Sequence, residues 1–68
     1  MKYKITTLNE FGNRMTRHYE SQVLAERDFN KLQDITRVWI VLWEGEKPVK
    51  YAEKINLKWK SVDIEETN

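Results

Sequence analysis

Few residues of this 68-residue chain have a type and spacing suited to catalysis. The one histidine, His18, can serve as a general base or a pH-sensitive contact. No Ser/His/Asp spacing and no second histidine accompanies it, so nothing supports a triad or a zinc site. We therefore expect His18 to be an exposed side chain rather than a catalytic one.

Cation and phosphate sites have equally little support. Glu44 and Glu46 flank a glycine and can offer oxygens to a hard cation, but calcium takes roughly six to eight of them. Gly12 and Gly45 are too far apart to form a phosphate-binding loop, and cysteine is absent. We expect the two glutamates to be turn residues, and we predict no metal, no cofactor and no enzymatic activity.

Aromatic residues interleaved with lysines are the stronger chemical signal. Four aromatic residues occupy odd positions of predicted strands: Trp39, Trp43, Tyr51 and Trp59. If the strand register places them on one face, they form a platform. The nearby lysines are Lys50, Lys54, Lys58 and Lys60. Single-stranded nucleic acid can stack on such a platform at about 1 to 3 kcal/mol per base, with lysines near the phosphates.

The same aromatic residues can instead anchor a protein interface, where Trp and Tyr are favoured. A third interpretation is that each Trp packs beneath a helix, although one short helix has too little room for all of them. Along an extended strand Lys50, Lys54 and Lys58 point away from Tyr51 and Trp59. Stacking and phosphate contacts would then lie on opposite faces, so we rank a protein interface above nucleic acid.

Length and charge limit the class of protein. A chain of 68 residues makes one domain, near the lower size limit for a core without disulfides or metals, and we therefore expect a homodimer. Charged residues make up 34% of the chain, but the net charge is only +1. The absence of cysteine and of a long apolar segment favours a cytoplasmic protein that does not bind membranes. Residues 61–68 contain three acids and no base, and we expect a partly frayed acidic tail there.

The elements that must position these residues are organised around residues 37–43, Arg-Val-Trp-Ile-Val-Leu-Trp. This run is apolar on both faces and is followed at once by a turn signal around Gly45, which predicts a central strand. Residues 2–8 alternate as a half-buried strand, and a loop over 9–13 leads to an edge strand over 14–20.

Ser21 is a suitable N-cap for a helix that we predict to extend through Gln33. Its apolar stripe contains Ala25, Phe29 and Leu32. Residues 49–59 alternate with period two, which predicts one long strand or two strands bent near Asn56.

The predicted fold is α+β: an antiparallel sheet of four or five strands with one helix on one face, in the order ββαββ. We predict a small protein-interaction module that uses the aromatic sheet face for self-association or for binding a protein partner. A single-stranded nucleic-acid-binding protein is the alternative. In size and lack of catalytic groups the chain resembles small accessory or inhibitor proteins of phages and mobile elements, although no motif supports this analogy.

Overall fold

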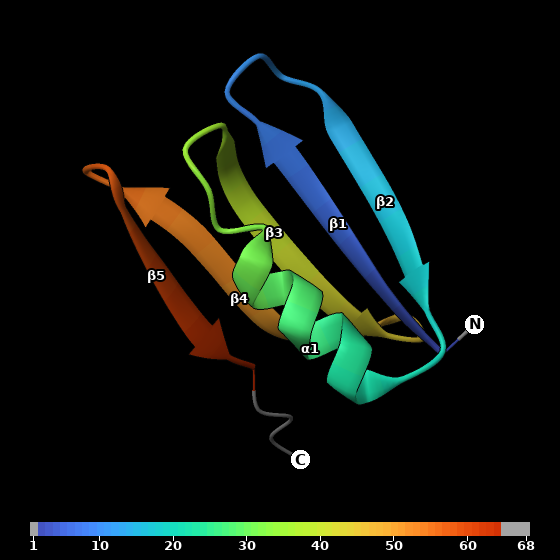
Figure 1. The fold of residues 1–68 in the computed structure, drawn as a ribbon. Coiled ribbons are helices and arrows are strands. Elements are labelled where there is room, and N and C mark those ends of the chain that lie inside the picture. The colour runs from blue at the N-terminus through green and yellow to red at the C-terminus, as the bar shows by residue number, and fades with distance from the viewer. Residues whose placement is uncertain (1, 65–68) are drawn as a thin grey trace.

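The computed structural model describes residues 2–64 and shows a five-stranded antiparallel sheet with one helix (Figure 1). The elements in chain order are β1 (Tyr3–Asn9), β2 (Arg14–Tyr19), α1 (Gln22–Lys31), β3 (Arg37–Glu44), β4 (Lys47–Ile55) and β5 (Lys58–Asp63). The strand order in the sheet is β2-β1-β3-β4-β5. The α+β class and the antiparallel sheet are therefore confirmed.

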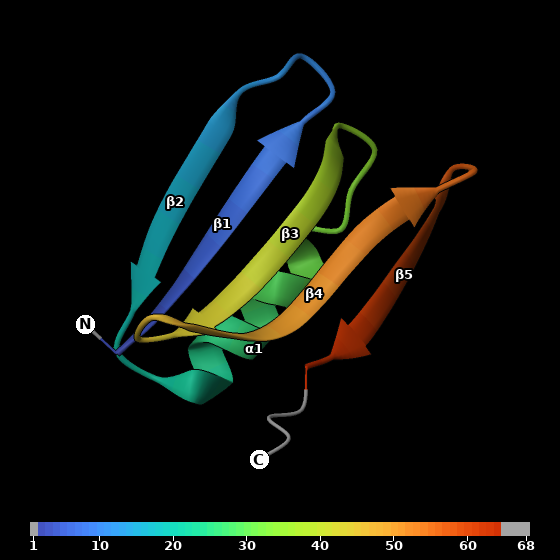
Figure 2. The same ribbon diagram turned by 180° about the vertical axis from the view of Figure 1, so that it is seen from behind.

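The strand β3 lies at the centre of the sheet, as its apolar character predicts, and β2 lies at one edge. Helix α1 covers one face only, and the reverse view shows the other face without a helix (Figure 2). The predicted order ββαββ is wrong in one respect, because three strands follow the helix rather than two. We call the sheet face that packs against α1 the helix face and the opposite one the open face.

Helix α1 forms where its cap and its apolar spacing predict. The Ser21 Oγ accepts a hydrogen bond from the Leu24 amide at 3.5 Å, which satisfies one free donor of the first turn. Ala25 and Phe29 are fully buried and Leu32 nearly so. The helix ends at Lys31 with Leu32 as its C-cap, slightly earlier than the predicted end at Gln33.

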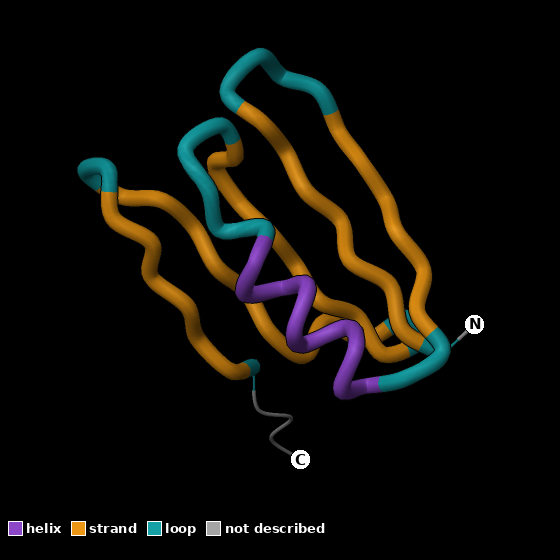
Figure 3. Tube along the Cα trace, viewed as in Figure 1, coloured by secondary structure: helices purple, strands orange, loops and turns teal. Residues whose placement is uncertain are grey.

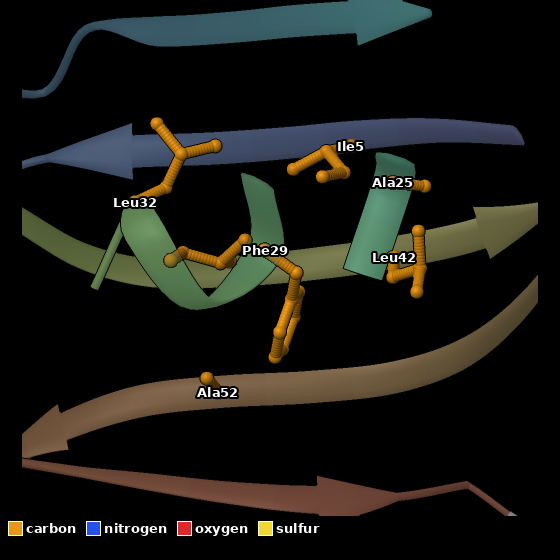
Figure 4. Packing of buried hydrophobic residues seen from close by; sticks show 7 residues of the cluster. Ile5, Ala25, Phe29, Leu32, Leu42 and Ala52 are labelled. Atoms are coloured by element: carbon orange, nitrogen blue, oxygen red, sulfur yellow. The ribbon is translucent and has the colours of Figure 1, made fainter. Parts of the chain in front are cut away.

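The core lies between α1 and the three central strands (Figure 4). Its sheet side consists of Ile5, Ile40, Leu42 and Ala52, each buried. Ala52 leaves space above β4, and the ring of Phe29 extends from the helix toward it. Burying an aromatic side chain of this size contributes about 2 to 3 kcal/mol, so Phe29 is the main contact between helix and sheet.

Two hairpin loops follow their sequence signals. In the loop between β1 and β2, Gly12 has φ +84°, and the Asn9 side chain accepts hydrogen bonds from the amides of Phe11 and Asn13. Between β3 and β4, Gly45 has φ +62°. Glycine tolerates this left-handed backbone without a Cβ clash, so both chain reversals are encoded locally.

A third hairpin separates β4 from β5 and was not predicted as such. Asn56 and Leu57 both have positive φ, 52° and 66°, which matches a two-residue type I′ turn. The long strand predicted over 49–59 therefore reverses direction at Asn56. The predicted acidic tail overlaps the end of β5 at residues 61–63, and residues 65–68 lie outside the described residues.

This turn generates a stability prediction. Leu57 has an unfavourable left-handed backbone and a side chain that is 89% exposed. Replacing it with glycine should raise the free energy of unfolding by about 0.5 to 1 kcal/mol, measured by urea denaturation. Leu57→Ala keeps the Cβ and should give no such gain. If both variants change stability equally, backbone strain at Leu57 is not the cause.

Candidate interaction surface

The strand register gathers three of the four predicted aromatic residues on the open face. Trp39 lies between Leu8 of β1 and Glu53 of β4, and Val41 lies between Thr6 and Tyr51. One pair further along, Trp43 lies beside Lys4. Side chains of directly paired residues share one face of a sheet. Trp39, Val41, Trp43 and Tyr51 therefore form a continuous strip, which we call the aromatic strip.

The side chains of the aromatic strip are neither buried nor fully exposed. All four are of intermediate exposure, in contrast to Ile40 and Leu42, which alternate with them along β3 and are buried under the helix. The aromatic strip is thus an apolar surface that neighbouring side chains cover in part. It lies on the sheet face that α1 does not cover. Partly exposed Trp and Tyr side chains are the residue types that most often anchor protein interfaces.

Trp43 is held in place by two neighbours from β1. Its indole Nε1 donates a hydrogen bond to the Thr6 Oγ1 at 2.9 Å. The Lys4 Nζ lies 5.1 Å from the centre of the indole ring, within cation–π range. These contacts restrict the rotamer of Trp43, so its side chain has little conformational entropy left to lose in any further contact.

Tyr51 is also held by a neighbour on the open face. Its hydroxyl donates a hydrogen bond to the Glu53 carboxylate at 2.5 Å. This hydrogen bond, together with partial burial and the nearby negative charge, raises the pKa of Tyr51. The phenol therefore stays neutral through the physiological range, and the Glu53 carboxylate is already occupied by an intramolecular donor.

The structure divides the predicted lysine stripe between the two faces. Across the β4–β5 hairpin, Lys54 pairs with Trp59 and Ile55 pairs with Lys58, so an even position of β4 shares its face with an odd position of β5. Lys50 and Lys54 therefore lie on the helix face, whereas Lys58 and Lys60 lie on the open face. The prediction that Lys50, Lys54 and Lys58 project together is wrong. The two-residue turn puts Lys58 on the sheet face opposite to Lys50 and Lys54.

The two lysines on the helix face have structural partners. The Lys50 Nζ lies 3.5 Å from a Glu26 oxygen and 3.7 Å from an Asp63 oxygen, and 5.6 Å from the centre of the Phe29 ring. The Lys54 Nζ donates to the Ile35 carbonyl at 2.6 Å. These contacts connect β4 to the helix and its following loop, so neither lysine belongs to the candidate surface.

Trp59 does not belong to the aromatic strip, which corrects the prediction of a four-residue platform. It lies on the helix face and packs against the core, and its Nε1 donates to the Asp34 carbonyl at 3.0 Å. The loop that contains Asp34 lies at the same end of the molecule as the β4–β5 turn (Figure 3). Trp59 thus connects the edge strand to the helix–β3 loop.

Asp34 organises the loop that accepts the Trp59 hydrogen bond. Burial alone would raise its pKa, but hydrogen bonds from the Thr36 hydroxyl and amide and from the Arg37 amide outweigh it and lower the pKa. The Arg37 guanidinium pairs with the same carboxylate. A lowered pKa means that ionised Asp34 stabilises the fold above its ordinary pKa of 3.8, and that this stabilisation is lost as pH falls.

The residues first considered for catalysis do not converge on a reactive site. His18 is exposed on the open face and is paired across the strands with Lys4. A shallow depression beside it also contains Glu46. Among residues 2–64, no group of three or more His, Cys, Asp or Glu residues is placed to hold a metal ion. Among the described residues, the aromatic strip on the open face is therefore the candidate surface.

Sequence reasoning missed residues on β1 that complete the surface. Lys4 and Leu8 border the aromatic strip, yet neither was singled out from the sequence. Their alternation with Tyr3 and Ile5 was visible in the sequence. The missing information was that β1 pairs with β3, because only that neighbour places Lys4 beside Trp43.

Comparisons with protein-family models, curated proteins and solved structures gave no match to this chain. In residues 2–64, helix α1 is too short and polar to cross a membrane.

The different placement of the tryptophans predicts different effects on stability. Trp59→Ala removes packing against the core and the Asp34 hydrogen bond, and should lower the free energy of unfolding by about 2 to 3 kcal/mol. Trp39→Ala should cost about 1 kcal/mol, because its side chain lies on the open face. Urea denaturation of both variants tests the order. A larger loss for Trp39→Ala would contradict the assignment of faces.

Proposed function

We propose that this protein is a small non-enzymatic interaction module that binds a protein partner through its open face. The observation that supports this most directly is the aromatic strip on the side of the sheet that α1 leaves uncovered. Trp and Tyr are the side chains that most often supply the binding energy of protein interfaces. The strip combines two Trp residues and one Tyr with aliphatic neighbours.

Preorganisation supports the same proposal. Trp43 is fixed by Thr6 and Lys4, and Tyr51 by Glu53, on a backbone of paired antiparallel strands. A rigid surface loses little entropy on binding, so more of the energy of burying its aromatic rings contributes to affinity. A partner with a flat apolar surface can bury the strip without rearranging the sheet.

The charges around the strip indicate the chemistry of the partner. The bordering cations on the open face are Lys4, Arg14, Lys58 and Lys60. Glu53 is an acid among the paired residues of the open face, and its carboxylate already accepts a hydrogen bond from the Tyr51 hydroxyl. An apolar surface with acidic side chains at its margin would be complementary, and two open faces placed against each other would repel. We therefore favour a different protein over a second copy as the ligand of this face.

The proposal predicts a face-specific cross-link. Benzoylphenylalanine at position 39, in the full chain expressed in the cells that naturally make it, should give a discrete protein adduct on illumination. Position 23 is the control, because Val23 is 73% exposed on α1. The adduct should be lost with Tyr51→Ala, while the melting temperature of that variant shows whether the fold is retained. Equal adducts from positions 39 and 23 would contradict the proposal.

One observation favours single-stranded nucleic acid as a second candidate. The register places Lys58 and Lys60 on the same face as Tyr51 and Trp39, so cations and aromatic rings lie together. The sequence had indicated that Lys58 points away from Tyr51. This arrangement matches the combination of stacking side chains and phosphate-binding cations that single-strand binders use.

This candidate makes a prediction with a matched control. A fluorescent mixed-sequence oligonucleotide of about 20 nucleotides should bind at low salt, with affinity that falls steeply as salt increases. Lys58→Glu/Lys60→Glu should weaken binding at least about tenfold, whereas Arg27→Glu/Lys31→Glu makes the same charge change at exposed positions of α1, away from the open face. Fluorescence anisotropy measures both. Equal losses, or no binding at low salt, would exclude the candidate.

A further inference from the structure

Three connections lie at one end of the sheet, and each exposes a large apolar side chain there. They are the β1–β2 loop (residues 10–13), the α1–β3 loop (32–36) and the β4–β5 turn (56–57), which both views place at the same end (Figure 1, Figure 2). Phe11 is 76% exposed, Ile35 82% and Leu57 89%, the highest values for large apolar side chains among residues 2–64. We call this end of the molecule the loop end and these three side chains the apolar tips.

Hydrogen bonds join the three connections of the loop end. The Glu10 amide donates to the Thr36 carbonyl at 2.8 Å. The Lys54 ammonium and the Trp59 indole donate to carbonyls of the same α1–β3 loop, at 2.6 Å and 3.0 Å. The three connections are therefore held in fixed positions along the end of the sheet.

The fold alone does not explain a leucine at position 57. Its φ of 66° is a left-handed conformation, for which glycine or asparagine is the usual residue. The Leu57 side chain does not offset this strain by packing, because it lies almost entirely in solvent. A bulky residue in an unfavourable backbone conformation, with an exposed side chain, indicates a contact with another molecule.

Behind the apolar tips, the ends of β4 and β5 carry a tryptophan and cations. Trp59 lies two residues after Leu57, and Lys54 is paired with it across the hairpin. Lys58 and Lys60 flank Trp59 in the sequence. The order from the tips inward is thus apolar side chains and then Trp with Lys. An anionic bilayer has a matching order, because its acyl chains lie beneath an interface that favours Trp and headgroups that attract cations.

Most acids near the loop end face a cation of this chain. Asp34 pairs with Arg37, and Glu53 is paired with Lys60 across β4 and β5. Glu10, in the β1–β2 loop, is the remaining acid at this end among the described residues. The cations that outnumber it there are Arg14, Lys54 and Lys58. The charge around the apolar tips is therefore complementary to an anionic surface.

We propose that the loop end docks on the surface of an anionic lipid bilayer, with Phe11, Ile35 and Leu57 inserted among the acyl chains and the lysines near the headgroups. The three tips belong to three different connections, so a protein would need a separate socket for each. A fluid bilayer accepts them without matching cavities. The absence of a long apolar segment argues against a spanning helix, but contact through loop tips needs none.

Co-sedimentation of the full chain with sucrose-loaded vesicles tests this proposal. Phosphatidylcholine vesicles with about 30% phosphatidylglycerol should bind the chain more tightly than phosphatidylcholine alone, and binding should weaken as salt increases. Phe11→Ser, Ile35→Ser and Leu57→Gly should each weaken binding at least about fivefold. The matched control is Val23→Ser, because Val23 is similarly exposed but lies on α1, and it should bind like the unmodified chain.

A polarity-sensitive dye tests the orientation on the vesicle. The chain has no cysteine, so a single introduced cysteine can be labelled. The emission of a dye on Leu57→Cys should shift to the blue when anionic vesicles are added. A dye on Glu46→Cys, in the β3–β4 turn at the opposite end of the sheet, should show no shift (Figure 1).

Several results would overturn this proposal. They are an absence of binding to anionic vesicles at low salt, an equal loss with Val23→Ser, and equal dye shifts at positions 57 and 46. Leu57→Gly removes an apolar tip while relieving backbone strain, so unfolding does not account for its loss of binding; urea denaturation confirms its stability. None of these variants changes the aromatic strip or the lysines beside it, so the cross-link from position 39 tests the partner-binding function separately.

Discussion

The packing of one helix on one face of a five-stranded sheet is the constraint on which the rest of this structure depends. Phe29 and Ala25 bury the helix against Ile5, Ile40 and Leu42, and the small Ala52 makes room for the aromatic ring. A helix of ten residues covers only part of such a sheet. The opposite face must therefore be stabilised by its own side chains or by another molecule.

On the open face, the chain's own side chains cover part of the apolar surface. Trp43 lies against β1 through its hydrogen bond to Thr6, and the Lys4 side chain lies over the ring. These contacts cover part of the apolar surface while leaving the aromatic strip partly exposed. The same contacts thus reduce the exposed apolar area and restrict the conformation of Trp43, which is the property that the proposed interaction requires.

Side chains of the β4–β5 hairpin attach this part of the sheet to the helix and to the loop that follows it. Lys50 and Lys54 contact groups of α1 and of the loop after it, and Trp59 bonds to the Asp34 carbonyl. These interactions attach the outer part of the sheet to the single helix, which otherwise lies over β1, β2 and β3. The open face, by contrast, carries the aromatic strip on which the proposed interaction depends.

The sequence by itself determined the fold class, the central strand, the helix with its Ser21 cap, and the two hairpins that contain glycine. Each of these depends on local patterns: alternation, helical spacing, or a residue suited to a left-handed backbone. It placed Trp39, Trp43 and Tyr51 at odd strand positions without deciding whether they share a face, and the register puts them on one face. Only the tertiary structure decided the placement of Trp59 and Lys58. The turn at Asn56 and Leu57 lacks the usual glycine, so it had no clear sequence signal, and it puts even residues of β4 on the same face as odd residues of β5. The pairing of β1 with β3, which brings Lys4 to Trp43, is a contact between residues distant in sequence and has no local signal.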